Sequence, residues 1–174
     1  MLSQQLFFLL VALVALQRLL ELWWSHRNEK ALLASGGIRC AHEHFKWMKL
    51  IHASWLIAMV LEVWIFKRPF YPLLGGLSLF LFAIGQLVRI TAIATLGQRW
   101  TASIMVLPGK KLVSHGLYRF IKHPNYVGVI VEIAFLPLVH SAILTSVIFS
   151  LLNLIILRIR IVHETQALKK YCIE

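Results

Sequence analysis

Three apolar segments of membrane length, residues 2–24, 47–66 and 71–96, constrain this chain more than any other feature of its sequence. A helix needs about 20 apolar residues to cross about 30 Å of hydrocarbon, and each segment reaches that length. Two shorter apolar segments, residues 126–138 and 142–157, follow. Because backbone polar groups must be satisfied inside a membrane, all five segments are predicted to be helices. We expect an all-α polytopic membrane protein with about five transmembrane helices.

The composition of the 174 residues indicates one membrane domain. Apolar residues make up 59% and charged residues 14% of the chain, whereas soluble domains contain about 45–50% and about 25%. No linker or internal repeat divides the sequence, so residues 1–174 are predicted to form a single integral membrane domain. Residues 1–97 supply the first three transmembrane helices. Residues 98–174 are expected to hold the cofactor-binding and catalytic region.

The net charge of +11 is attributed to membrane sidedness, and no nucleic-acid partner is expected. When alternate loops are assigned to alternate sides, one side receives only Lys67 and Arg68. The other side receives Arg27, Lys30, Arg39, Lys46, Lys49, Arg99, Lys110, Lys111, Arg119, Lys122, Lys169 and Lys170. The positive-inside rule then places the N-terminus outside and the C-terminus in the cytoplasm. For a bacterial protein this predicts the plasma or inner membrane, with membrane lipids as partners.

The fourth and fifth apolar segments are too short to cross a bilayer comfortably, and the fourth contains Glu132 and Pro137. We predict that these two helices form a hairpin packed inside the bundle, with its turn near His140 and Ser141. A carboxylate inside such a segment needs a partner. Glu132 is expected either to form a structural hydrogen bond with Arg89, Gln86 or Asn153, or to take part in catalysis.

This hairpin unites two polar stretches of the sequence, residues 112–129 and 158–164. In the first stretch, Pro124 stands at a predicted first helical position, between His123 and Asn125. A proline there marks a helix N-terminus, whose free N–H groups attract an anion. The first stretch is therefore a candidate binding site for an anionic group.

The second stretch adds charges of both signs. Arg160 and Glu164 are four residues apart, so they project from one face of a helix. A ligand with a carboxylate, an ammonium group and a flat ring that lies against Tyr118 or Tyr126 suits the combined set. S-adenosylmethionine meets this description.

Residues 98–168 resemble the isoprenylcysteine carboxyl methyltransferase family of membrane methyltransferases. The run LVSHGLYRFIKHPNYVG is similar to the family's Leu-Val, Gly-x-Tyr and Arg-His-Pro-x-Tyr elements, with Lys122 in place of the usual Arg. The run RIVHE is similar to the Arg-x-x-Glu-Glu element, with His163 in place of the first Glu. The resemblance implies that S-adenosylmethionine is the cofactor and that it is held by Leu112, Val113, Tyr118, His123, Pro124, Asn125, Tyr126 and Glu164. It also implies that Arg160 binds the methyl acceptor, so Arg160 and Glu164 are the expected catalytic residues.

The N-terminal run RLLELWWSHRN and the GG that follows it resemble a compact bacterial branch of this family. Members of that branch are thought to O-methylate long-chain polyketide pyrones or resorcinols. The expected function is therefore O-methylation of a lipophilic acceptor that enters from the bilayer, with the active site on the cytoplasmic face. The acceptor is either an isoprenylcysteine-type carboxylate or a long-chain pyrone or phenol. A carboxylate needs only a positioning cation such as Arg160, whereas a phenol gains from a base such as His163 or Glu164.

Two other functions stay open. The C-terminal region is also similar to membrane NADPH-dependent reductases of the steroid-reductase type, and a non-enzymatic membrane protein is the third interpretation. The chain lacks GxGxxG, so a nucleotide-derived cofactor is not expected in a Rossmann crevice. No metal site is predicted, because only His42 and His44 lie close together and no ligand pattern surrounds them. Cys40 and Cys172 match no disulfide or metal spacing, and the oligomeric state stays open.

Overall fold

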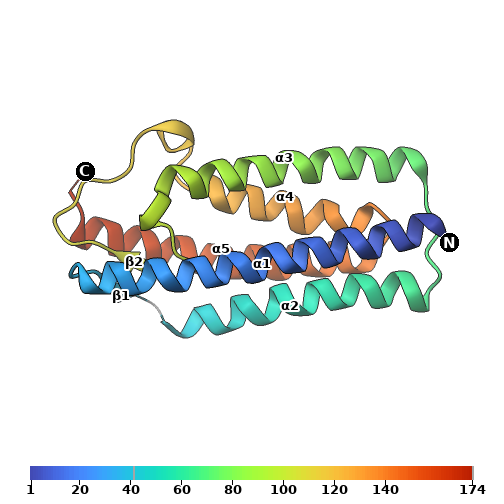
Figure 1. The fold of residues 1–174 in the computed structure, drawn as a ribbon, viewed down its shortest axis with the longest axis horizontal. Coiled ribbons are helices and arrows are strands. Elements are labelled where there is room, and N and C mark those ends of the chain that lie inside the picture. The colour runs from blue at the N-terminus through green and yellow to red at the C-terminus, as the bar shows by residue number, and fades with distance from the viewer. Residues whose placement is uncertain (41, 174) are drawn as a thin grey trace.

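The computed structural model describes residues 1–40 and 42–173, without the side chains of residues 42–45. The described residues form five α-helices that lie along one axis (Figure 1): α1 (Leu2–Ala34), α2 (His42–Ile65), α3 (Pro72–Leu96), α4 (Pro124–Leu138) and α5 (Ile143–Tyr171). Successive helices run in opposite directions, so the two termini lie at opposite ends of the bundle. Within the described chain, the four helices other than α4 are long and apolar enough to cross a membrane. The architecture is that of a multi-pass integral membrane protein.

Helices α1 and α5 extend well beyond the apolar segments that predicted them, residues 2–24 and 142–157. Hydropathy reports contact with lipid, whereas a helix continues for as long as its backbone bonds and packing allow. The last turns of α1 bury Ser25, Asn28 and Glu29 on one face. Their helical spacing directs these polar groups toward the segment between α3 and α4. The extra turns of α1 therefore serve to hold that segment.

A small sheet that the sequence did not predict closes the end of the bundle that carries the C-terminus. Strand β1 (Ile38–Cys40) pairs antiparallel with strand β2 (Ile104–Val106). The C-terminal residues join the same end, because the Leu112 N–H donates to the Ile173 carbonyl at 3.2 Å. The Ile173 N–H in turn donates to the Lys110 carbonyl at 3.2 Å. Backbone bonds thus fix the loop after β2, whose residues carry much of the candidate site.

Helices α4 and α5 form the predicted antiparallel hairpin, with a turn at residues 139–142 (Figure 1). Helix α4 also packs closely on α3, because Gly85 and Gly128 face each other. A Cβ atom on Gly128 would lie only 2.7 Å from the Gly85 carbonyl oxygen, so this helix crossing requires glycine. The close approach places the first turn of α4 beside the end of α3.

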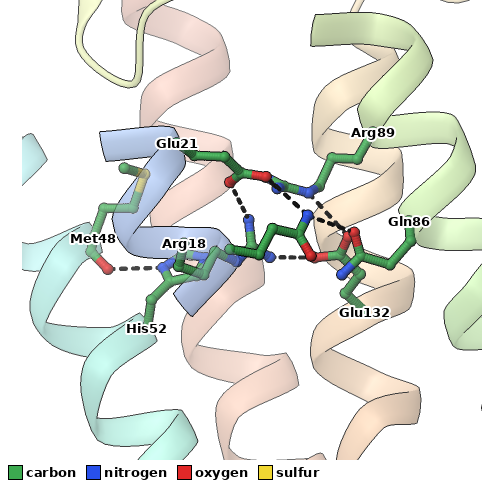
Figure 2. Close-up of polar contacts among 8 residues, drawn as sticks. Arg18, Glu21, Met48, His52, Gln86, Arg89 and Glu132 are labelled. Carbon is green, nitrogen blue, oxygen red and sulfur yellow. Dashed lines mark hydrogen bonds and ion pairs between the residues drawn. The ribbon is translucent and has the colours of Figure 1, made fainter. Parts of the chain in front are cut away.

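A network of charged side chains joins α1, α3 and α4 inside the bundle (Figure 2). The fully buried Glu132 forms ion pairs with Arg18 and, at 2.9 Å, with Arg89. Glu21 pairs with Arg18 at 3.4 Å and also with Arg89. Two arginines and two glutamates carry no net charge together, which limits the energetic penalty of burying them among apolar helices. The predicted pairing of Glu132 with Arg89 is confirmed.

Candidate functional site

A cavity of about 400 Å³ opens at the end of the bundle that carries the C-terminus. Its wall comes from the end of α3, strand β2, the loop between β2 and α4, and the last turns of α5. This volume lies within the range of about 300–1,000 Å³ that is typical of small-molecule sites. Both polar stretches singled out in the sequence contribute to the wall.

The loop between β2 and α4 supplies four of the predicted cofactor residues to the wall: Leu112, Val113, Tyr118 and His123. The loop contains the short 3-10 helix η2 (Gly116–Arg119), which directs Tyr118 toward the cavity. Burial, and to a smaller extent the charge of Glu164, raises the pKa of Tyr118. Its phenol therefore stays protonated at neutral pH and is available as a hydrogen-bond donor.

Pro124 and Asn125, unlike His123 before them and Tyr126 after them, do not line the main cavity. Helix α4 begins at Pro124, as the sequence predicted, and His123 is its N-cap. The proline ring is fully buried and lies outside the lining of the cavity, so its role here is to start the helix. Asn125 lines a smaller recess of about 50 Å³ that shares Tyr118 and His123 with the main cavity. Its Oδ1 atom is buried and has no hydrogen-bond partner among the described residues.

The hairpin brings the first turn of α4 against Glu164 of α5. The Tyr126 hydroxyl donates a hydrogen bond to Glu164 Oε2. His123 Nδ1 lies 3.8 Å from Glu164 Oε1, and the His123 ring stacks on the Tyr126 ring with centroids 5.4 Å apart. Two groups from the start of α4 therefore orient one carboxylate that lines the cavity.

Arg160 is 4% exposed and also lines the cavity. Its Nε donates to the Tyr126 hydroxyl at 3.4 Å, and its NH2 group donates to the Ala102 carbonyl at 2.8 Å. Among the described residues, no carboxylate forms an ion pair with Arg160. A buried guanidinium held by neutral groups offers its positive charge to an anionic ligand atom.

Helix α1 holds the backbone of Ala102, the residue whose carbonyl orients Arg160. Ser25 Oγ accepts a hydrogen bond from the Ala102 N–H at 2.8 Å, in the peptide group that precedes the one whose carbonyl binds Arg160. Asn28 Nδ2 donates to the neighbouring Trp100 carbonyl at 2.7 Å. The sequence analysis did not identify Ser25 and Asn28 as residues that support the site. The signal that indicates them is the helical spacing of the polar residues in RLLELWWSHRN, which continues the face of the buried charges.

The remaining charges of the cavity wall are mostly positive. Among the described lining residues, Glu164 is the acidic one, and the basic ones besides Arg160 are Arg99, Lys110, Lys111, Lys122 and Lys169. His163, the other predicted base candidate, is not part of the lining, whereas Glu164 is. The wall therefore suits a ligand that carries an anionic group and presents hydrogen-bond donors to one carboxylate.

The structure offers no metal centre in the part of the chain whose side chains it describes. No group of three or more His, Cys, Asp or Glu side chains there could hold a metal ion. The side chains of His42 and His44 lie outside the described residues. Cys40 and Cys172 are both free thiols.

Comparison with known proteins shows which protein family the chain matches. Residues 77–170 match the family described as isoprenylcysteine carboxyl methyltransferase (ICMT). Uncharacterized protein YpbQ of Bacillus subtilis (strain 168) is 32% identical over 169 residues, which cover 97% of this chain and 100% of that protein. An uncharacterized protein of Haemophilus influenzae is 30% identical over 146 residues, covering 83% of this chain and 84% of that protein.

Two eukaryotic proteins are similar over part of their length. Protein-S-isoprenylcysteine O-methyltransferase B of Arabidopsis thaliana is 30% identical over 92 residues, 47% of each chain. The solved structure of the eukaryotic intramembrane Ras methyltransferase ICMT superposes with a TM-score of 0.52 and 22% identity, over 74% of this chain and 47% of that chain. The chain thus matches about half the length of each, and the structural likeness shows a shared fold.

Proposed function

The chain belongs to the isoprenylcysteine carboxyl methyltransferase family, and on that premise we propose that it is an S-adenosylmethionine-dependent O-methyltransferase of a lipophilic acceptor. One observation carries the proposal. His123, Tyr126, Arg160 and Glu164, from two distant parts of the sequence, meet at one cavity at the end of an apolar helical bundle. A methyltransferase of this kind needs a polar donor site that borders on lipid, and this arrangement supplies one.

The residues of the cavity fit a donor of this chemistry. The Glu164 carboxylate accepts hydrogen bonds from an ammonium group or from ribose hydroxyls, and the basic rim suits the donor's carboxylate. The buried Asn125 Oδ1, which has no partner among the described residues, is a further acceptor for the donor's N–H groups. Bound there, S-adenosylmethionine supplies an activated methyl group on a sulfonium. Leu112, Val113, Tyr118 and His123 would hold it and exclude water.

Arg160 is the proposed binding group for the acceptor. Its guanidinium is fixed by Tyr126 and by the Ala102 carbonyl, and it has no carboxylate partner among the described residues. A carboxylate acceptor is already nucleophilic and needs only to be aligned, which one oriented cation achieves. A phenol acceptor also loses a proton, and Glu164 is the carboxylate in the cavity wall that accepts it. Both acceptor classes therefore use the same pair of residues.

We place the cavity on the cytoplasmic face of the membrane. The basic loops gather at the end of the bundle that carries the C-terminus and the cavity, whereas Lys67 and Arg68 lie between α2 and α3 at the other end (Figure 1). The charged donor then reaches the site from the cytoplasm. The acceptor's hydrocarbon chain stays in the bilayer and enters between helices.

Purified protein in lipid nanodiscs tests the proposal directly. Methyl-labelled S-adenosylmethionine is supplied with N-acetyl-S-farnesylcysteine or with pentadecylresorcinol, and labelled lipid product is measured. We expect transfer to one of the two acceptors and no binding of NADPH, the cofactor of the alternative reductase function. Binding of NADPH without binding of S-adenosylmethionine would overturn the proposal.

Two arginines provide the matched variants for this assay. Arg160→Gln removes the buried cation and should lower the rate of transfer by about a hundredfold, as loss of one oriented donor does elsewhere. Arg158→Gln removes an exposed cation two residues away and should leave the rate near that of the wild type. Equal rates for Arg160→Gln and the wild type would contradict the role of Arg160.

A further inference from the structure

The loop between β2 and α4 also carries two outward-facing apolar side chains, Phe120 and Ile121, that the proposed reaction does not use. Phe120 follows η2 and is 81% exposed, and Ile121 next to it is 38% exposed. Arg119 and Lys122 flank them, and the Arg119 guanidinium lies 5.8 Å from the centre of the Phe120 ring. We name these four residues, Arg119 to Lys122, the interfacial wedge. Two exposed apolar side chains between two cations form a small amphipathic surface.

The depth of the wedge follows from the contact between α3 and η2, the short helix whose last residue is Arg119. Gly116, at the start of η2, lies so close to Thr95 that a Cβ atom on it would be 3.1 Å from Thr95 Oγ1. Thr95 belongs to the last turn of α3, where a membrane-length helix ends. The wedge therefore lies beside the end of a span, at the level of the membrane–water boundary. Aromatic and basic side chains gather at that level because one part contacts acyl chains and the other contacts headgroups.

The charge of the wedge selects the kind of lipid. The sequence contains no Asp or Glu between Glu62 and Glu132, so the loop has no acidic residue of its own. Lys110 and Lys111 add to the positive charge of the same loop. Clusters of this kind bind anionic headgroups, and each cation near the surface strengthens binding.

The wedge is rigidly connected to the cavity wall. The Tyr118 N–H donates to the His115 carbonyl at 3.2 Å, and the Ile121 N–H donates to the Leu117 carbonyl at 3.0 Å. One short turn therefore presents Tyr118 to the cavity and Phe120 to the outside. Leu112, Val113 and His123 flank this turn in the same loop and line the same cavity. Any contact that fixes the wedge also fixes this wall.

We propose that the interfacial wedge docks on anionic lipid of the leaflet nearest the C-terminus, and that docking orders the cavity wall so that anionic lipid tightens donor binding. The docking surface stands on exposure, depth and charge alone. The effect on the donor rests on the proposed function. The two parts are therefore tested by separate measurements.

Photo-cross-linking tests the surface. p-Benzoylphenylalanine at position 120 should form adducts with lipid in nanodiscs of phosphatidylcholine and phosphatidylglycerol, and phosphatidylglycerol should be over-represented among them. The same group at position 115, which is exposed on the same loop but outside the wedge, should form few adducts. Similar adduct yields at positions 115 and 120, or adducts without enrichment of the anionic lipid, would overturn the docking surface.

Phe66 offers a matched control for the charge. It is 62% exposed at the other end of the bundle and lies 5.5 Å from the Arg68 guanidinium, much as Phe120 lies by Arg119. Arg68 is paired with Glu62 at 2.8 Å, so its charge is compensated. Cross-linking from position 66 should therefore reach lipid with a weaker preference for phosphatidylglycerol. In the Arg119→Gln variant, the preference at position 120 should fall on the order of fivefold.

Calorimetry tests the coupling to the cavity. The probe is S-adenosylhomocysteine, because it lacks the sulfonium charge and is not concentrated by an anionic surface. The wild type should bind it several-fold more tightly in mixed nanodiscs than in phosphatidylcholine alone, and Phe120→Ser should remove that difference. If S-adenosylhomocysteine bound with equal affinity in both kinds of nanodisc while the expected lipid adducts still formed, the coupling between wedge and cavity would be overturned and the docking surface would stand. Failure of the wild type to bind the probe in either lipid would overturn both the coupling and the proposed function, and the adducts would still decide the docking surface.

Discussion

The Tyr126 hydroxyl on α4 donates a hydrogen bond to the carboxylate of Glu164 on α5, 38 residues further along the chain. This contact joins the two polar stretches of the sequence at one cavity. It exists because a short turn folds α5 back along α4 and because the Gly85 and Gly128 contact sets the position of α4 against α3. Most of what we propose about function depends on this arrangement.

Tyr126→Phe should weaken donor binding by about tenfold, because a hydrogen bond to a charged group contributes about 1.5–3 kcal/mol. The phenol orients Glu164, and the variant leaves that carboxylate with only the longer contact to His123, at 3.8 Å, from the start of α4. Calorimetric titration with S-adenosylmethionine measures the effect. Tyr71→Phe is the control, since Tyr71 is exposed just before α3 at the other end of the bundle. An unchanged Kd for Tyr126→Phe would contradict the role of Glu164 in donor binding.

Ser25→Ala should impair use of the acceptor without affecting binding of the donor. Ser25 Oγ fixes the backbone at Ala102, and the carbonyl of that residue binds Arg160, so loss of the hydroxyl allows the guanidinium to move. A neutral hydrogen bond contributes about 1 kcal/mol, which corresponds to an increase of about fivefold in KM for the acceptor. Ser25→Thr keeps the hydroxyl and should retain most of the activity. Ser35→Ala, at the exposed end of α1, should behave as the wild type, and a matching loss in both alanine variants would refute the link.

Glu132→Leu should destabilise the fold by about 3–5 kcal/mol, because Arg18 and Arg89 then share one carboxylate inside the bundle. The double variant Arg18→Met with Glu132→Leu leaves Arg89 and Glu21 as a neutral pair, so it should recover much of that loss. Reversible unfolding in mixed micelles measures both. A double variant less stable than the single one would show that the charges act separately.

Tyr118 predicts the response of the fold to alkaline pH. Burial raises the pKa of Tyr118, whereas an unfolded tyrosine ionises near about 10. The stability linked to its protonated phenol is therefore complete below about pH 10 and is lost as the pH rises above it. Tyr118→Phe should flatten this decline relative to the wild type, as measured by unfolding midpoints across that range. If the unfolding midpoints of Tyr118→Phe and the wild type declined in parallel with rising pH, the result would contradict a buried, protonated Tyr118.

Hydropathy was sufficient to place the five helices and the α4–α5 hairpin, because apolar length and the position of charges report directly on the membrane. It did not give the ends of α1 and α5, since those turns leave the lipid and are held by polar contacts such as Asn28 with the Trp100 carbonyl. It also did not give the β1–β2 sheet. Three-residue strands far apart in sequence carry no periodic signal of their own.

In the candidate site, too, the sequence predicted some features and not others. The helical spacing of Arg160 and Glu164, together with the family resemblance, predicted that these two residues share a site with His123 and Tyr126, and the four line one cavity. The Ala102 carbonyl that binds Arg160 was not predicted, because a backbone group has no signature in a sequence. Pro124 was expected to bind the cofactor, and the structure places it outside the lining of the cavity, as the first residue of α4.

Cross-linking of S-adenosylmethionine to the protein tests whether the two polar stretches form one donor site. Ultraviolet irradiation of the wild type with labelled S-adenosylmethionine, followed by proteolysis and mass spectrometry, identifies the residues that contact it. We expect label on peptides from both residues 112–126 and residues 160–172, and we expect it to disappear when unlabelled S-adenosylhomocysteine competes. Label confined to other segments, or to one of the two with the other untouched, would contradict a single donor site formed by the folded-back helix pair.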